Sequence, residues 1–209
     1  MNEITQISPQ VKDKRRCNIY IDGKFCCGLT LETAVKNRLK VGVCITPERL
    51  SQIQLESEKN TALDKALTHL SATKKTEKQM REFLQKKGYL EGVIEYVLEK
   101  LRGYNFVNDG EYAEEYASFA SKKKGLRLVE RELMQKGIDK ESIENALSTV
   151  DGEAQEECAR AILQKYMRAK TADRETLAKA YRYLLSKGFS YELAKSVIGE
   201  YGQVEEDDE

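Results

Sequence analysis

Residues 103–150 read GYNFVNDGEYAEEYASFASKKKGLRLVERELMQKGIDKESIENALSTV, and this stretch says most about the architecture. Its apolar residues recur at three- and four-residue steps, the spacing that puts side chains on one face of a helix. We expect Asp109 to cap a first helix and Gly125 to end it in the left-handed conformation. A second helix should end at Gly137, and Asp139 should cap a third. The residues expected to share these faces are Tyr112, Ala113, Tyr116, Ala117, Phe119 and Ala120, then Leu126, Val129 and Leu133, then Ile143, Ala146, Leu147 and Val150.

The same three-helix unit occurs three times along the chain. Each copy contains a leucine four residues before a glycine, with a lysine directly before that glycine, and the copies are 49 and 51 residues apart. The first copy starts near Ala62, and Thr76 with Gln79 forms a capping-box pattern before its second helix. Repeats of this length typically pack each unit on its neighbours, so we expect a mainly α fold of tandem three-helix repeats in an elongated arrangement. The aligned segments are LQKKG (84–88), LMQKG (133–137) and LLSKG (184–188), and the expected repeats span 60–102, 103–151 and 152–202.

Residues 1–59 have a different pattern, typical of a small β-hairpin followed by helices. Asp22-Gly23 is the two-residue turn that a type I′ hairpin prefers, and it separates two short segments rich in strand-forming residues. Thr30 and Thr46 both suit the start of a helix. The expected strands are Cys17–Ile21 and Lys24–Leu29, with Ile4–Ile7 as a candidate third strand, and the expected helices begin at Leu31 and Pro47.

Composition also favours a mainly α-helical protein. Prolines occur only at Pro9 and Pro47, so the long remainder of the chain contains no proline to interrupt a helix. Lysine plus arginine equals aspartate plus glutamate at 35 each. Residues 205–209 are all acidic, so the rest of the chain has a net charge of about +5. The sequence therefore describes a mildly basic body with an acidic tail at 203–209. That tail is either a solubilising end or a segment that masks the basic surface.

Targeting and redox signals point to the cytoplasm. No apolar run approaches the ~18 residues of a membrane span, and the amino terminus lacks the basic and apolar regions of a signal peptide. The five cysteines contain no Cys-x-x-Cys pair. We expect a cytoplasmic protein with reduced thiols and no membrane partner.

Residues that could support catalysis are few. His69 is the only histidine, so no second imidazole is available for a metal site or an acid–base pair. The sequence contains no Gly-x-x-x-x-Gly-Lys phosphate loop and no nucleophile elbow. We expect no catalytic residue, no metal and no cofactor, so the chain is predicted not to be an enzyme.

Basic residues near the junction of two expected helices are the better candidates for a binding site. They lie within ten residues of one another, and two of them are one helical turn apart. The same lysines would also suit the carboxyl end of a helix, where positive charge is favourable, so a purely structural role stays open. The candidate residues for binding a partner or DNA are Lys122, Lys123, Lys124, Arg127 and Arg131.

The stretch 103–150 resembles the RecX family of recombinase regulators. The resemblance implies tandem three-helix repeats that bind the RecA recombinase filament and limit its assembly, ATP hydrolysis or strand exchange in recombination and DNA repair. It implies the RecA filament as partner, with the DNA phosphate backbone inside that filament as a further contact, and we expect a monomer. The matching features, in order, are the aromatic-Asn-Asp turn at 106–109, Tyr112-Ala113, Lys124-Gly125, ELMQKGI at 132–138, Ile143 and Ala146-Leu147.

Two other functions stay open on the residues alone. Three-helix units with a basic second helix also describe helix-turn-helix domains, so the alternative is an independent helical nucleic-acid-binding module. The helix expected at 126–136 offers mostly charged side chains, which suits phosphates better than base edges. A protein-binding scaffold with a different partner fits the same pattern.

Overall fold

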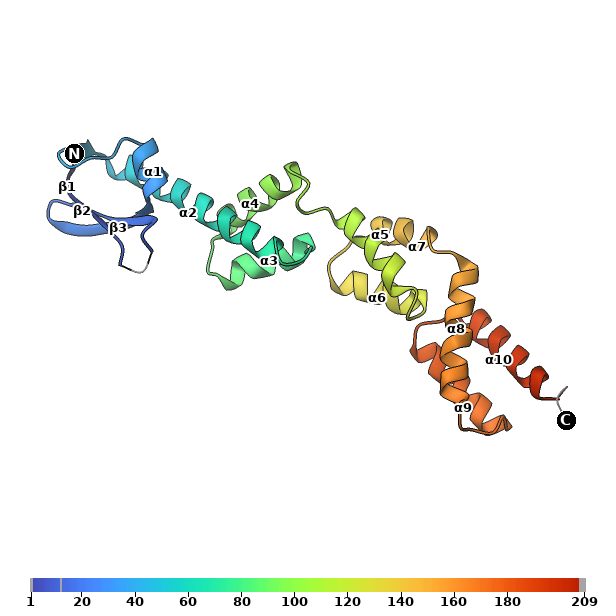
Figure 1. The fold of residues 1–209 in the computed structure, drawn as a ribbon. Helices are drawn as coiled ribbons and strands as arrows, with labels where there is room; N and C mark the ends of the chain where they lie inside the picture. The colour runs from blue at the N-terminus through green and yellow to red at the C-terminus, as the bar shows by residue number, and fades with distance from the viewer. Residues whose placement is uncertain (1, 12, 207–209) are drawn as a thin grey trace. The chain divides into compact units, whose positions relative to one another are not determined.

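The computed structural model describes the backbone of residues 2–11 and 13–206 and the side chains of these segments up to Tyr201. The protein is mainly helical, at 62%, with ten helices in the described part and a small antiparallel sheet at the amino terminus (Figure 1). It divides into two compact units. The N-terminal unit holds the residues up to Lys74 together with Met80–Val107, and the C-terminal unit holds Lys75–Gln79 and the residues from Asn108 onward.

The predicted hairpin is confirmed and belongs to a four-stranded antiparallel sheet. Asp22 and Gly23 both have positive φ angles, 49° and 78°, as a type I′ turn requires. The candidate third strand is also present, and a two-residue strand adds the fourth, which is too short to show any alternation in the sequence. The neighbouring strands in the sheet follow the order β3-β2-β1-β4. Along the chain, the strands are β1 (Asn2–Pro9), β2 (Arg16–Ile21), β3 (Lys24–Thr30) and β4 (Cys44–Ile45).

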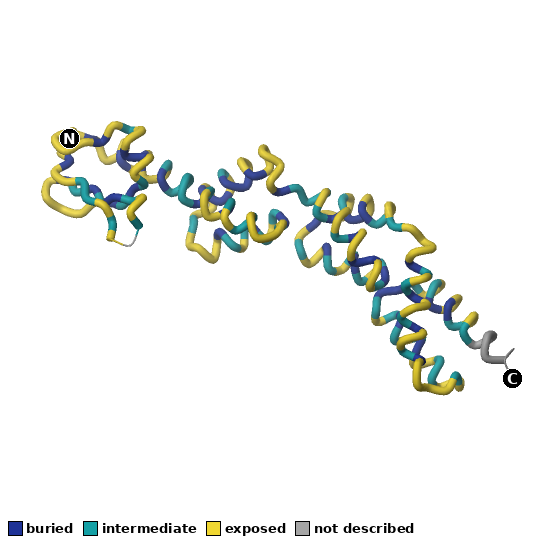
Figure 2. The backbone as a smooth tube through the Cα atoms, viewed as in Figure 1, coloured by how far each residue is buried: buried dark blue, intermediate teal, exposed yellow. Residues whose placement is uncertain are grey.

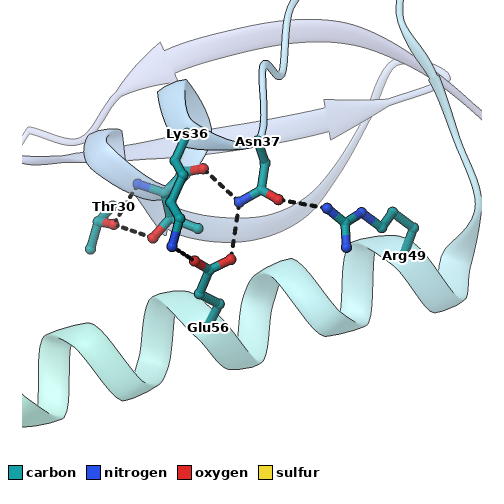
Figure 3. A network of polar contacts seen from close by, with 6 residues as sticks. Thr30, Lys36, Asn37, Arg49 and Glu56 are labelled. Atoms are coloured by element: carbon teal, nitrogen blue, oxygen red, sulfur yellow. Dashed lines mark hydrogen bonds and ion pairs between the residues drawn. The ribbon is translucent and has the colours of Figure 1, made fainter.

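Polar contacts attach the short helix α1 (Leu31–Lys36) to the helix that follows the sheet (Figure 3). The Lys36 ammonium lies 2.6 Å from a Glu56 carboxylate oxygen, and the Asn37 side-chain amide donates to the other oxygen at 3.1 Å. Arg49 donates to the Asn37 side-chain oxygen at 2.8 Å. The hydrogen bond from Lys36 and then that from Asn37 hold the pKa of Glu56 below its usual range. The carboxylate is therefore a charged anchor between the two helices.

One long helix, α2 (Pro47–Leu70), replaces two helices that the sequence suggested. It starts at the predicted Thr46 cap, and positions 48–87 contain neither glycine nor proline, so nothing in them ends the helix near Ala62. Its first half packs Ile53 into the core beneath the sheet, and its second half packs Ala66 into the core of the first repeat. Helices α3 (Glu77–Lys86) and α4 (Glu91–Gly103) complete that repeat.

The C-terminal unit contains two further three-helix repeats. Val129, Leu133 and Ile143 are buried as the apolar spacing predicts, and the tube in Figure 2 alternates between buried and exposed residues along each helix. Phe119 departs from the predicted face and is 63% exposed, because the inner face of its helix is made by alanines and leaves the larger rings at the boundary. The helices are α5 (Asp109–Ala120), α6 (Leu126–Gln135), α7 (Lys140–Ser148), α8 (Gly152–Met167), α9 (Arg174–Ser186) and α10 (Tyr191–Glu206).

Glycine plays two different roles at the ends of these helices. Gly88, Gly137 and Gly188 have φ angles of 83°, 88° and 91°, so the predicted Lys-Gly stops are confirmed. The same prediction for Gly125 is wrong, because its φ angle is −73° and it caps the start of α6. A Cβ atom at Gly125 would lie 2.2 Å from the carbonyl carbon of Gly188. Glycine is needed there for the close approach of two backbone segments and not for a left-handed turn.

Asp109 is the second correction, because Asn108 caps α5. The Asn108 side-chain oxygen accepts from the Glu111 backbone N–H at 3.1 Å. Asp109 is the first residue of α5, and its carboxylate accepts from the backbone N–H of Glu77 at 2.9 Å. Burial raises the pKa of Asp109. A residue predicted to cap its own helix therefore caps the start of α3, a contact that a local sequence pattern does not reveal.

The start of α3 is held by further contacts inside the C-terminal unit. The predicted capping box is confirmed, since Thr76 N–H donates to Gln79 Oε1 at 3.1 Å and Gln79 N–H donates to Thr76 Oγ1 at 3.3 Å. The Thr76 hydroxyl also donates to the Lys136 carbonyl at 2.7 Å. The Lys78 ammonium donates to the Gln135 carbonyl at 3.0 Å. These bonds satisfy carbonyls at the end of α6 that have no partner within the helix.

Candidate partner-binding surface

The five predicted binding residues differ in position and in exposure. Lys122 and Lys123 are exposed in the turn after α5, and Arg127 and Arg131 are exposed on α6. Lys124 differs, because its side chain is only 24% exposed. Four of the five predicted residues are therefore exposed, and Lys124 is partly buried.

Lys124 makes a network inside the second repeat. Its ammonium lies 2.8 Å from both carboxylate oxygens of Glu132, and the Tyr116 hydroxyl donates to the same carboxylate at 2.6 Å. Burial raises the pKa of Tyr116 to about 12, and the hydrogen bond to Glu132 adds to this rise. For Glu132, burial acts to raise the pKa, but the hydrogen bonds from Lys124 and Tyr116 outweigh it and the pKa is lowered. The charge of Lys124 is therefore neutralised by the fold.

This network predicts a loss of stability in acid. The folded-state pKa of Glu132 lies below the unfolded value of about 4.3, so the stabilisation is complete above that pH and disappears as the pH falls toward the folded value. We expect the Glu132→Gln variant to be less stable at neutral pH but to lose less stability on acidification. Urea unfolding at a series of pH values measures both. Glu130→Gln, a change two residues away in α6, is the matched control, and an acid slope in Glu132→Gln equal to that of the control contradicts the network's role.

The α6 residues Arg127 and Arg131 differ in their surroundings. The Arg127 guanidinium lies 4.5 Å from the centroid of the Tyr191 ring, within range of a cation–π interaction. Its backbone N–H donates to the Gly188 carbonyl at 3.0 Å. Arg131 lies one turn further along and has no side-chain hydrogen bond or ion pair with any described residue. Arg131 is thus the more available of the two for a partner.

A second basic site lies beside the predicted cluster and includes one of its members. Lys123 lines a hollow of about 490 Å³ together with lysines from the third repeat. Two tyrosine rings, Tyr166 and Tyr183, form part of its wall and stack at 4.6 Å between centroids. We call this site the lysine hollow, and its basic residues are Lys123, Lys165, Lys170 and Lys187.

Three of these four lysines are missing from the candidates that the sequence suggested. The sequence assigns Lys187 only to a helix end and gives Lys165 and Lys170 no binding role. A signal was present for two of them, because Lys170 follows Tyr166 by four residues and Lys187 follows Tyr183 by four. At or just past the end of a helix, a lysine four residues after an aromatic residue can bring its ammonium to the ring, as Lys170 and Lys187 do.

Two kinds of site can be tested directly on the described residues. Between residues 2 and 201, apart from residue 12, no three His, Cys, Asp or Glu side chains gather as metal ligands do. Across the same part of the chain, every helix is too short or too polar to cross a membrane.

Comparison with known proteins assigns a family to the whole chain. The model of the regulatory protein RecX N-terminal domain matches residues 2–46. Models of the first, second and third three-helix domains of RecX match residues 62–101, 108–147 and 153–198. The four matches follow the order of the sheet and the three repeats, and each repeat model covers one three-helix unit of the structure.

Individual relatives agree with the family models. The regulatory protein RecX of Clostridium beijerinckii is 34% identical over 212 residues, which covers both chains completely. That of Listeria monocytogenes serovar 1/2a is 34% identical over 95% of this chain and 75% of its own. A crystal structure of regulatory protein RecX superposes with a TM-score of 0.74 at 28% identity, covering 94% of this chain and 98% of the other. The RecX structure from Lactobacillus salivarius gives a TM-score of 0.64 at 28% identity, over 68% of this chain and 96% of its own. The chain belongs to the RecX family, whose members are regulatory proteins and not enzymes.

Proposed function

We propose that this protein binds the filament of the RecA recombinase and limits its assembly, ATP hydrolysis and strand exchange. The observation that carries the proposal is the match of all four RecX family models, in order, along the chain. The regulatory role belongs to the family, and the recombinase as target is the step that we add. We place the protein in the cytoplasm as a monomer, with the repeats divided at 60–102, 103–151 and 152–202.

The basic residues of the C-terminal unit support a contact with an acidic surface or with DNA. Lys122, Lys123, Arg127 and Arg131 are exposed, and none of them forms an ion pair within the described segments. A long filament presents the same surface many times, so weak contacts at several of these residues act together through effective concentration. Lys124 has no place in this contact, because Glu132 already holds its ammonium.

The test is the ATPase rate of preformed RecA filaments on single-stranded DNA, with this protein added below the concentration of recombinase. We expect inhibition by the wild-type chain. The variant Lys122→Glu/Lys123→Glu/Arg127→Glu/Arg131→Glu should fold and inhibit at least tenfold less well, since each reversal replaces attraction by repulsion. The control Lys140→Glu/Lys179→Glu/Lys195→Glu reverses surface charge elsewhere in the same unit. Equal inhibition by the folded quadruple variant would exclude these four residues, and no inhibition by wild type would exclude the proposed function.

An independent nucleic-acid-binding module remains the second candidate because of the lysine hollow. Its four ammonium groups can bind phosphates without a recombinase. Salt-sensitive DNA binding by the wild-type chain, combined with no effect on the recombinase, would favour this candidate.

A further inference from the structure

We propose that the lysine hollow is a binding site for the phosphate backbone of a single-stranded nucleic acid. Its lysines contact adjacent phosphates, and the site does not recognise the bases. The inference rests on the proposed function only for the presence of nucleic acid near this protein. The charge, the aromatic contacts and the size of the hollow support the site itself.

The hollow concentrates positive charge that the fold leaves uncompensated. Its lining includes four lysines, two tyrosines and Ile162, and it includes no carboxylate. None of the four lysines forms an ion pair with a described residue. This contrasts with Lys124 close by in the chain, whose charge is satisfied by Glu132. Four like charges around one hollow repel each other, and an anion in the hollow would relieve that repulsion.

Aromatic rings position the lysine side chains. The Lys170 ammonium lies 3.1 Å from the centroid of the Tyr166 ring, and the Lys187 ammonium lies 5.0 Å from that of Tyr183. Lys123 lies 4.3 Å from the ring of Phe119. A ring face attracts an ammonium without neutralising it, so these groups stay charged and able to donate hydrogen bonds. Positioning them before the ligand arrives reduces the entropy lost on binding.

The same contacts indicate that the ligand presents phosphates to the hollow and not bases. Tyr166 and Tyr183 stack on each other with an interplanar angle of 24°, and each also carries a lysine within cation–π range. Their faces are therefore occupied and offer no platform for a base. Binding through the backbone alone is independent of base sequence, so its affinity should depend on salt and not on base composition.

The size of the hollow favours a strand over a single small anion or a duplex. A volume of about 490 Å³ equals that of about 16 waters at ~30 Å³ each, which is more than one phosphate group fills. A segment with two successive phosphates and the sugar between them would use more of this space, with the lysines of the lining as donors. A duplex is too wide to enter a space of this size, so it meets only the rim.

An acidic peptide fits the lining less well. A peptide backbone in a pocket needs hydrogen-bond acceptors for its N–H groups as well as donors for its carbonyls. The only polar side chains in the lining are lysines, which only donate, and two tyrosine hydroxyls. Phosphate oxygens only accept hydrogen bonds, so they match ammonium donors without leaving a group unsatisfied.

The test is fluorescence anisotropy of a labelled oligothymidine with the full chain, without recombinase, over a series of salt concentrations. The hollow variant is Lys165→Gln/Lys170→Gln/Lys187→Gln, and the control Lys140→Gln/Lys179→Gln/Lys195→Gln removes three charges from the same unit outside the hollow. Each phosphate contact adds about 0.7 to the salt slope for a single strand, so we expect the slope of the hollow variant to fall by about 2. Affinity at moderate salt should fall at least tenfold, with little change in the control.

Two further measurements keep the test decisive. The variant Lys165→Arg/Lys170→Arg/Lys187→Arg retains the charges and should retain the salt slope of the wild type, which shows that charge and not folding is measured. Polyglutamate of equal charge should compete poorly with the oligonucleotide. A slope in the hollow variant equal to that of the control, or equal competition by polyglutamate, would overturn the proposal.

The same variants separate this inference from the proposed function. If the wild-type chain binds the oligonucleotide through the hollow but leaves the ATPase of the recombinase filament unchanged, the hollow is confirmed and the proposed function fails. If the hollow variant binds the oligonucleotide as well as the control does, the hollow is excluded, whatever the filament assay gives.

Discussion

Replacing Leu133 with alanine is expected to lower the free energy of unfolding by ~2–5 kcal/mol, because the change removes a buried side chain and leaves a cavity. Leu133 has no exposed surface and lies on the inner face of α6. It belongs to the same buried cluster as Val129, Ile143 and Ala146, so helices α6 and α7 both contribute to the site, and alanines of α5 complete it. Urea unfolding at neutral pH, followed by circular dichroism, measures the loss.

The neighbouring residue provides the control for this prediction. Met134 lies next to Leu133 in α6 and is 48% exposed, so Met134→Ala should change stability by less than ~0.5 kcal/mol. Leu84 and Leu184 occupy the matching positions of the other repeats and are also fully buried. Their alanine variants should cost amounts similar to Leu133→Ala. A cost below ~1 kcal/mol at Leu133 would mean that the inner face of α6 is wrongly assigned.

Leu133 also illustrates what the sequence alone could predict. Its burial follows from apolar residues at helical spacing, and that spacing depends only on residues within one helix. The stops at Gly88, Gly137 and Gly188 are equally local, because each places a glycine where the backbone turns left-handed. Because the apolar spacing and the glycine stop recur together at similar intervals, they were enough to predict the three repeats.

Contacts between distant segments account for the predictions that were wrong. Asn108 and Asp109 are residue types of about equal preference at a helix cap. The Asp109 carboxylate instead accepts a hydrogen bond from the backbone N–H of Glu77, which lies far away in the sequence. Helix α2 was divided in two because its halves serve two different cores, which gives its apolar residues no single face. The acidic tail at 203–209 lies outside the residues whose side chains the structure describes.

The candidate site was predictable only in part for the same reason. The sequence placed Lys123 and Lys124 together, yet Lys124 is held by Glu132 in the second repeat while Lys123 faces lysines of the third. Adjacent side chains in a turn point in different directions, so one lysine meets a carboxylate of the next helix and the other meets a different repeat. Charge counts in a short window therefore identified Lys123 but not the hollow that it lines with lysines of the third repeat.

Replacing Gly125 with alanine is the second large effect that we expect, a loss of roughly 2–6 kcal/mol in the free energy of unfolding from overpacking and broken hydrogen bonds together. A Cβ atom at this position would lie 2.2 Å from the Gly188 carbonyl carbon and the Phe189 nitrogen, both in the backbone of the third repeat. Overpacking of this kind costs ~1–3 kcal/mol. The separation that it forces also breaks two hydrogen bonds, from Gly125 N–H to the Lys187 carbonyl at 2.9 Å and from Arg127 N–H to the Gly188 carbonyl at 3.0 Å. Each contributes ~0.5–1.5 kcal/mol.

Two measurements distinguish this local effect from general damage. Gly199→Ala is the matched control, because Gly199 lies in α10 with no atom within 4 Å of the added Cβ, and alanine there should raise stability by up to ~1 kcal/mol. Hydrogen exchange of the Arg127 amide should be faster in Gly125→Ala than in wild type and unchanged in Gly199→Ala. If Gly125→Ala keeps both wild-type stability and a protected Arg127 amide, the two repeats do not meet backbone to backbone. If Gly125→Ala loses both stability and protection of the Arg127 amide, the junction between the repeats depends on Gly125. Only glycine fits there because the backbone of Gly188, in the next repeat, occupies the space of a Cβ atom.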